Sequence, residues 1–357
     1  MSTLKHYFII SLYCLFGGSI LSATAQTENL GLFDNENPLK MTLSGTLPPF
    51  SEDPSKTPRK YLQVLSYQNA NGNKMEIPIE VKTRGHFRRL LGHCSYPPLQ
   101  LIFPKNEVQQ TSIFKDQSKT KLVMPCRGDE YVIREWLVYK LYNLISPYSF
   151  RVRLVQLTLE DEQRKKPIEP FYAFLLEEEK QIAKRLQMLP LERKLRANAT
   201  QAEHFLRMAV FEYLIANTDW SVEHLQNIKL LTPDAKTLPI PVPYDFDHAG
   251  LVDAPYAKPA MELELGSVRD RRYRGYCLEN VQQFEPVIAH FNALKDKIYQ
   301  IFSDCNLLNP KYQKSTMLFL DEFYATINNP KKWQKEFLYP CDPNGTGYVV
   351  IKGLRED

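Results

Sequence analysis

The segment IANTDWSVEHLQN, residues 215–227, sets single polar side chains among apolar neighbours, and it decides how the chain is interpreted. It places Asp219 eight positions before Asn227, which opens the strand-like run NIKLL. A strongly apolar helical pattern over residues 202–217 leads into it. Because an acid is costly to bury without a bound partner, this setting predicts that Asp219 lies at the edge of a hydrophobic core, beside a cation.

A second segment, VPYDFDHAG at residues 242–250, repeats the pattern with Asp245 and Asp247 around one phenylalanine. Phosphoryl transfer uses an aspartate, then an asparagine and a strand, and a further aspartate after a second strand. The two segments follow this order. We therefore expect Asp219 to orient or deprotonate an attacking hydroxyl. Asn227 and Asp245 are candidate Mg²⁺ ligands, with Asp247 as a further ligand or a support for them. The alternative is two unrelated turns, which also favour Asn and Asp.

Two earlier residues fit the same chemistry. Lys121 begins a buried-looking strand, and Glu135 lies on a helical pattern over residues 130–145 whose face is partly apolar. A lysine on a strand paired with a glutamate on a helix holds nucleotide phosphates in protein kinases. We expect the same ion pair here. The alternative is a solvated lysine and a half-exposed glutamate.

The basic run KTRGHFRR, residues 82–89, ends a strand with an Arg-Gly pair. Arginine donates planar, bidentate hydrogen bonds that suit phosphate, so Arg84, Arg88 and Arg89 are candidate phosphate contacts. The alternative is a hairpin turn with solvated arginines. A second basic run, RDRRYRG at residues 269–275, is typical of a solvated surface.

The 357-residue chain has the composition of a globular protein, with 43% hydrophobic and 24% charged residues. Its formal net charge of +4 is too balanced to indicate nucleic-acid binding. Residues 1–25 have the apolar centre and the small-residue end, Ala-Thr-Ala, of a secretory signal peptide. No later segment reaches the ~20 apolar residues of a transmembrane helix. We therefore expect an exported protein, periplasmic or extracellular, without a membrane span after signal removal.

Cysteine usage is consistent with export. Five cysteines follow the predicted signal peptide, and the sequence has no C-x-x-C motif that would indicate zinc. An oxidising compartment permits disulfides, and an odd number of cysteines leaves at least one thiol unpaired. We expect Cys94 to pair with Cys126, because each lies beside a strand-like segment of the same region. Cys305 with Cys341 is the second pairing considered, and the alternative is buried free thiols throughout.

The chain changes character near residue 179. A polar linker at 26–36 precedes a strand-rich first half, with a hairpin at 61–85, strands at 98–103, 121–126, 150–161 and 171–178, and a helix at 130–145. The second half is helix-rich, with helices at 202–217, 279–303 and 313–328 and short strands at 227–231 and 242–246. The last thirty residues carry proline, glycine and aromatics and are expected to be irregular. We expect a ligand site between the two halves.

The ordered motifs TRGHFRR, KLVMPC, REWLVYKLYN, FYAFLLEE, IANTDWSVEHLQN and VPYDFDHAG resemble the CotH-type spore-coat kinase-like family, in an exported bacterial branch. The resemblance covers roughly residues 80–255. It implies an α+β, bilobal, atypical protein-kinase-like fold. The implied parts are a strand-rich N-lobe at 37–178, a helical C-lobe at 179–335 that carries the metal and catalytic motifs, and an irregular tail at 336–357.

By that resemblance Asp219 is the catalytic aspartate, and Asn227 and Asp245 bind metal. Lys121 and Glu135 form the nucleotide-binding ion pair. The implied cofactors are Mg²⁺ or Mn²⁺ together with ATP or another nucleotide.

Together these features predict an exported Mg²⁺-dependent phosphotransferase that acts on a hydroxyl of a protein or envelope polymer. Two alternatives stay open. The first is a non-catalytic, pseudokinase-type module that binds an envelope partner. The second is a metal-dependent hydrolase that uses Asp219, Asp245 and Asp247 with two metal ions.

Overall fold

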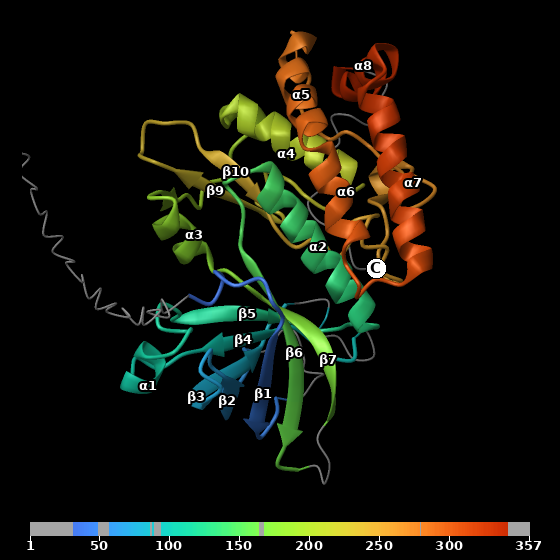
Figure 1. Ribbon diagram of the computed structural model, residues 1–357. Coiled ribbons are helices and arrows are strands. Elements are labelled where there is room, and N and C mark those ends of the chain that lie inside the picture. Colours follow the sequence, from blue (N-terminus) through green and yellow to red (C-terminus); the bar gives the residue numbers. More distant parts are fainter. Residues whose placement is uncertain are drawn as a thin grey trace, which may run out of the picture.

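The protein has a mixed α and β fold, seen in a computed structural model that describes residues 31–48, 57–85, 88, 94–163, 168–278 and 280–341. The first half of the chain forms a closed barrel, and the second half is mainly helical (Figure 1). The predicted signal peptide, residues 26–30 of the predicted linker, Arg89 and the tail from residue 342 lie outside the described residues.

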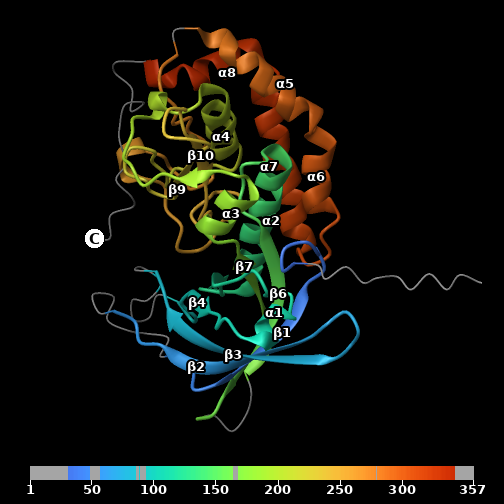
Figure 2. The ribbon, with the colours of Figure 1, turned by 90° about the vertical axis from the view of Figure 1, so that its left-hand side faces the viewer.

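The barrel has seven strands in the order β1-β2-β3-β4-β5-β7-β6 (Figure 2). Neighbours are antiparallel except β6 and β1, whose parallel pairing closes the barrel. Side chains alternate between its two faces, and the inward ones, such as Leu65, Ile77 and Leu157, form a core. The strands are β1 (Leu39–Gly45), β2 (Tyr61–Gln68), β3 (Lys74–Thr83), β4 (Leu99–Ile102), β5 (Lys119–Val123), β6 (Val152–Asp161) and β7 (Ile168–Leu176).

The predicted hairpin is confirmed as β2 and β3, which pair from Tyr61 with Val81 to Gln68 with Lys74. Gly72 in its turn has a φ of 78°, a conformation that glycine adopts without a steric penalty. No strand is predicted at β1. Its side chains alternate between buried and more exposed positions, but its parallel partner β6 lies far away in sequence.

The second half of the chain adds helices and a small antiparallel sheet of order β10-β9-β8. In Figure 1 the helices lie above the barrel, and α2 runs from one to the other. The helix predicted at 279–303 is divided into a 3₁₀ turn, α5 and α6. The helices are α1 (Glu107–Gln110), α2 (Asp129–Ile145), α3 (Glu179–Arg185), α4 (Ala202–Leu214), α5 (Glu285–Ala293), α6 (Lys295–Ser303), α7 (Pro310–Ile327) and α8 (Pro330–Phe337), and the strands are β8 (Leu189–Pro190), β9 (Ile228–Thr232) and β10 (Ile240–Pro243).

The end of the chain is more regular than predicted. Helix α8 has eight residues inside the stretch expected to be irregular. The Asn329 side chain caps it by accepting from the Lys332 N–H, and Pro330 lies in its first turn. Asn309 and Pro310 start α7 in the same way. Proline suits the first helical position because its missing N–H would be unpaired there anyway, so these prolines mark helix starts rather than loops.

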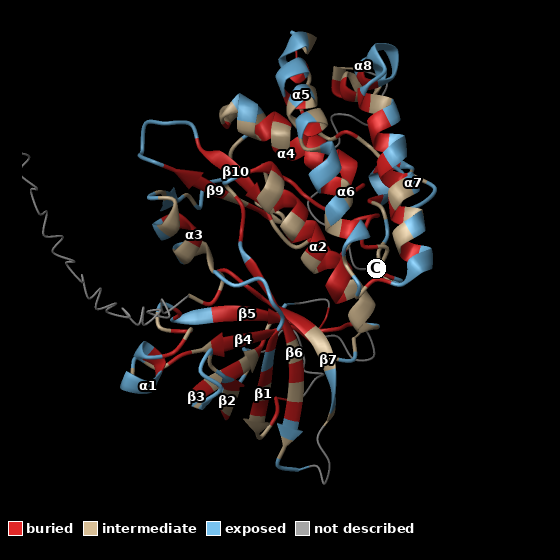
Figure 3. Cartoon of the chain, in the orientation of Figure 1, coloured by how far each residue is buried: buried red, intermediate tan, exposed pale blue. Residues whose placement is uncertain are grey.

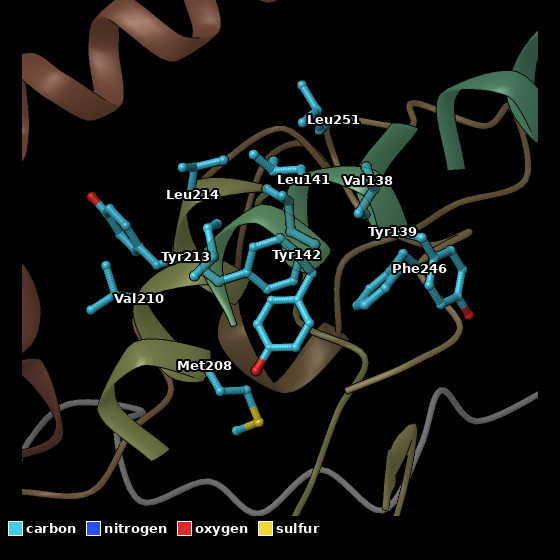
Figure 4. Packing of buried hydrophobic residues seen from close by; sticks show 14 of the residues in the cluster. Val138, Tyr139, Leu141, Tyr142, Met208, Val210, Tyr213, Leu214, Phe246 and Leu251 are labelled. Carbon is cyan, nitrogen blue, oxygen red and sulfur yellow. The ribbon is translucent and has the colours of Figure 1, made fainter. Parts of the chain in front are cut away.

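The helical part has its own hydrophobic core, and α2 belongs to it (Figure 3). Tyr142 of α2 packs on Phe211 of α4 with ring centroids 4.5 Å apart, and Tyr139 packs on Phe246 at 4.7 Å. Figure 4 shows Tyr139 directly beside Phe246. Helix α2, which belongs to the strand-rich first half of the chain, therefore packs in the hydrophobic core of the second half. This packing fixes how the barrel meets the helical part.

The predicted Cys94–Cys126 disulfide is confirmed, and the pairing of Cys305 with Cys341 is wrong. Cys341 is bonded to Cys277, and Cys305 is a partly buried free thiol. Two disulfides fit a protein that folds in an oxidising compartment. In the part of the chain that the structure describes, no helix has both the length and the apolar character to cross a membrane.

We predict that the Cys277→Ser/Cys341→Ser double variant loses roughly 2–5 kcal/mol in the free energy of unfolding, because the disulfide restricts the unfolded chain. The measurement is urea denaturation of the oxidised protein. Cys305→Ser is the matched control and should change stability by less than about 1 kcal/mol. Equal stability of the double variant and the control would contradict the assigned pairing.

Candidate functional site

Asp219 and Asn227 lie in direct contact in the loop between α4 and β9. The Asn227 Nδ2 donates to the Asp219 backbone oxygen at 2.8 Å and to its Oδ2 at 3.0 Å. The Asp219 N–H donates to the Asn217 side chain at 3.0 Å. The eight-residue spacing thus closes a loop whose two key side chains hold each other. Because Asp219 is buried, this contact orients its carboxylate.

Asp245 follows β10 and faces the barrel. Its carboxylate lies 3.3 Å from the Nζ of Lys121, which is on β5. Its backbone N–H donates to the Tyr139 hydroxyl of α2 at 2.8 Å. Asp245 has a φ of 65° and Asn227 a φ of 50°. Left-handed backbone at residues other than glycine costs of order 1–3 kcal/mol and is concentrated at functional sites.

Asp247 is held by a different cation. Its Oδ2 accepts from the Nε of Arg88 at 3.1 Å and from the Nη2 at 2.5 Å. The Tyr256 hydroxyl also donates to it, at 3.2 Å. Burial alone would raise the pKa of Asp247, but Arg88 and His248 outweigh it and hold that pKa below its ordinary value. Asp247 is therefore an ionised partner of Arg88.

The expected ion pair between Lys121 and Glu135 is not a contact of the described structure. Lys121 pairs with Asp245 instead, and the Glu135 carboxylate lies 3.6 Å from Arg88. Burial raises the pKa of Glu135 to about 8, against the opposing effect of Arg88. Asp247, expected to help bind metal, has its carboxylate engaged by Arg88. The physical reason for both differences is that Arg88 reaches the buried acids, which the sequence alone does not indicate.

Arg84 lies at the end of β3 and uses different partners from Arg88. Its Nη1 donates to the Gln100 side chain at 3.3 Å and lies 3.9 Å from the Glu178 carboxylate. The structure thus brings Arg88, but not Arg84, into contact with the acids of the candidate site.

The three aspartates are within electrostatic reach of one another. Burial raises the pKa of Asp219, and the negative charges of Asp247 and Asp245 raise it further, while His248 lowers it. The Tyr244 N–H donates to the Asn227 backbone oxygen at 3.0 Å, which joins the two loops. The loop of Asp219 and the loop of Asp245 therefore form one site.

Arg274 is a site residue that the sequence interpretation missed. The run RDRRYRG was expected to be a solvated surface, but Arg274 is partly buried and its Nη1 donates to the Thr218 backbone oxygen at 2.6 Å. It thereby fixes the backbone beside Asp219. Burial lowers the pKa of Arg274 to about 10. The available signal was Tyr273, the tyrosine between Arg272 and Arg274, which indicates packing rather than a solvated face.

The donor set fits a hard divalent cation bound together with a phosphate. Asp245 offers a carboxylate, and Asn227, whose amide nitrogen is used by Asp219, offers its amide oxygen. Mg²⁺ accepts one or two protein oxygens when substrate phosphates complete its shell. Within the described ranges, no group of three or more His, Cys, Asp or Glu side chains surrounds a common ion position. Asn227 and Asp245 are therefore the residues of this site that could hold such an ion.

Comparison with known proteins assigns no family. No family model matches the chain, and a search of curated proteins finds no match. The resemblance to the CotH-type family stays an expectation from the sequence motifs.

A buried glutamate beside the site predicts a pH dependence of stability. Burial raises the pKa of Glu212 on α4 from 4.5 to about 8, against smaller opposing effects of Asn217 and Arg274. The folded protein therefore holds a proton that the unfolded chain releases. Its contribution to stability is full below pH 4.5 and is lost as the pH rises through about 8.

We predict that Glu212→Gln, which keeps the shape without the charge, flattens the fall of unfolding free energy between pH 4.5 and about 8. The expected change in slope is at most about 1.4 kcal/mol per pH unit, the value for one proton. Urea denaturation across the pH range measures it. Glu203→Gln, an exposed glutamate on the same helix, is the control. Parallel pH profiles for wild type and Glu212→Gln would contradict the assignment.

Proposed function

We propose that this protein is an exported Mg²⁺-dependent phosphotransferase that moves a phosphoryl group from a nucleotide to a hydroxyl. One observation carries the proposal. The Asp219–Asn227 contact and the Lys121–Asp245 ion pair form one site where the barrel meets the helical part. Phosphoryl transfer requires these groups together: a base, metal-binding oxygens and a phosphate-binding lysine.

The nucleotide-binding groups come from both parts of the chain. The largely buried Lys121 presents its ammonium from the barrel and would bind phosphate oxygens. Asn227 and Asp245 would hold the metal, which supplies charge neutralisation at the phosphates. The hydrogen bond from the Asp245 N–H to Tyr139 holds the backbone at Asp245, and the hydrogen bonds from Asn227 to Asp219 hold the Asn227 side chain before any ligand binds.

Asp219 would accept the proton of the acceptor hydroxyl. The hydroxyl oxygen forms a bond to the terminal phosphorus, the bond from that phosphorus to the bridging oxygen breaks, and the nucleoside diphosphate leaves. The proton moves to the Asp219 carboxylate. A raised pKa suits this role, because a base works best when its pKa approaches the working pH.

The architecture supports the same proposal at a coarser level. A strand-rich barrel, a helix α2 that carries Glu135, and a helical part with the Asp219 and Asp245 loops follow the bilobal, kinase-like order expected from the motifs. The signal-like N-terminus and the two disulfides support export. The acceptor would then be an exported protein or an envelope polymer.

A non-catalytic binding module is the second candidate, and one contact favours it. In assembled protein kinases the lysine pairs with the helix glutamate, whereas here Glu135 contacts Arg88. A site fixed in this arrangement would bind a ligand without transferring phosphate. The hydrolase alternative is less well supported, because it needs Asp247, whose carboxylate is engaged by Arg88, to hold a second metal.

We predict that Mg²⁺ and ATP together, at about 100 times the dissociation constant, stabilise the protein by roughly 2.7 kcal/mol. Thermal melts with each ligand alone and with both measure the effect. Asp245→Asn should abolish it while tolerating the same backbone. Asp253→Asn is the matched control, since Asp253 also has a positive φ, of 57°, but lies outside the candidate site, with a side chain that is 45% exposed and paired with Arg269. No stabilisation by any of several nucleotides would contradict nucleotide binding.

We predict that Asp219→Asn retains this stabilisation but lowers phosphate transfer by on the order of 10²–10⁴-fold, because it removes the base. Labelling of envelope extracts with radioactive ATP measures transfer. Nucleotide binding by the wild type without any labelled acceptor or released phosphate would favour the non-catalytic module.

A further inference from the structure

A cavity of about 460 Å³ lies on the flank of α2, away from the acids of the candidate site. Its walls come from the segment at 33–36, helix α2, the chain between α2 and β6, and the end of α3. This volume is within the range of small-molecule pockets, ~300–1,000 Å³. Trp136, Lys140 and Asn143 line it from α2 at i, i+4 and i+7 spacing.

Three cations face this cavity: Lys140, Arg151 and Arg185. One of them is firmly positioned. Arg185 donates to both oxygens of the buried Glu177, at 2.9 and 2.8 Å, and to the Ser149 backbone oxygen at 2.8 Å. The Arg151 backbone N–H donates to the same Glu177 at 3.0 Å, which holds the backbone at Arg151 but not its guanidinium. Glu177 therefore fixes the side chain of Arg185 alone.

Two acids from the segment before β1 neutralise the remaining cations. Asp34 lies 3.0 Å from Arg151, and Glu36 pairs with Lys140. The Glu36 side chain is 77% exposed, and both members of the Asp34–Arg151 pair are 44% exposed. Exposed ion pairs contribute little to stability. Carboxylates thus already lie against the cations of this cavity, but they are held weakly enough to be displaced.

We propose that this cavity binds a small dianion bearing carboxylate or phosphate groups, with Asp34 and Glu36 as competitors from the chain itself. Lys140 and Arg151 bind the anionic groups, while Arg185, whose charge is neutralised by Glu177, forms part of the wall. Trp136 provides an apolar wall for the rest of the ligand. This site is independent of the phosphotransferase proposal, although Glu135 and Tyr139 lie on the neighbouring stripe of α2.

The test is isothermal titration of the full chain at low ionic strength with succinate and, separately, phenyl phosphate. The wild type should bind at least one of them, and the preference between them identifies the anionic group. Asp34→Asn/Glu36→Gln should bind on the order of 3- to 10-fold more tightly, because two weak competing ion pairs are removed. Glu76→Gln/Glu80→Gln, with the same charge change on the barrel surface, should bind like the wild type.

The opposite variant, Lys140→Gln/Arg151→Gln, should lose at least about 10-fold in affinity, since it removes two charged donors. Its matched control, Lys60→Gln/Lys74→Gln, removes two surface cations elsewhere and should retain binding. Thermal melts confirm that each variant is folded. The proposal is overturned if neither anion binds the wild type or the Asp34→Asn/Glu36→Gln variant at concentrations up to about 10 mM, which lies well above the ~1 mM dissociation constant of a weak complex. It is also overturned if each double variant binds like its control.

Discussion

Asp245 and Asp247, which are separated by a single phenylalanine, must be neutralised where the barrel meets the helical part. The geometry of the site depends on which cations neutralise them. Asp245 is paired with Lys121 from the barrel, and Asp247 is paired with Arg88. Leaving one member of a buried ion pair alone costs about 3–5 kcal/mol, so Arg88 is effectively required beside the buried Asp247. The phenylalanine between the acids, Phe246, is fully buried and anchors the segment. The two halves of the chain are thereby joined by charge as well as by apolar packing.

Helix α2 holds the backbone at Asp245 in place. Tyr139 packs on Phe174 of the barrel and on Phe246, and its hydroxyl accepts the N–H of Asp245. The same helix presents Glu135 to Arg88 one turn earlier. Asp245 therefore keeps a left-handed backbone that is unfavourable in isolation. Its carboxylate is directed toward Lys121 and lies in the same site as the Asp219–Asn227 pair, which is the arrangement that phosphate chemistry needs.

Local patterns predicted much of this structure, and long-range pairing accounts for what they missed. The β2–β3 hairpin and α2 follow from turn residues and helical spacing, and Asp219 and Asn227 meet because their spacing closes one loop. Arg88 reaching Asp247 could not be foreseen, because the two residues are 159 positions apart. The Cys277–Cys341 bond, 64 positions apart, depends equally on tertiary packing. Sequence patterns between residues close together in the chain thus predict local structure. Which of several buried acids pairs with a given cation is determined by the tertiary fold.

The most direct measurement is a crystal structure of the protein with Mn²⁺ and a non-hydrolysable ATP analogue, using the anomalous signal of the metal. We expect the Mn²⁺ to be bound by oxygens of Asn227 and Asp245, with a phosphate oxygen within hydrogen-bond distance of the Lys121 Nζ. Asp219 should face the terminal phosphate. A metal and nucleotide bound elsewhere, or crystals that bind neither while the Lys121–Asp245 pair stays closed, would contradict a phosphotransferase site at this junction.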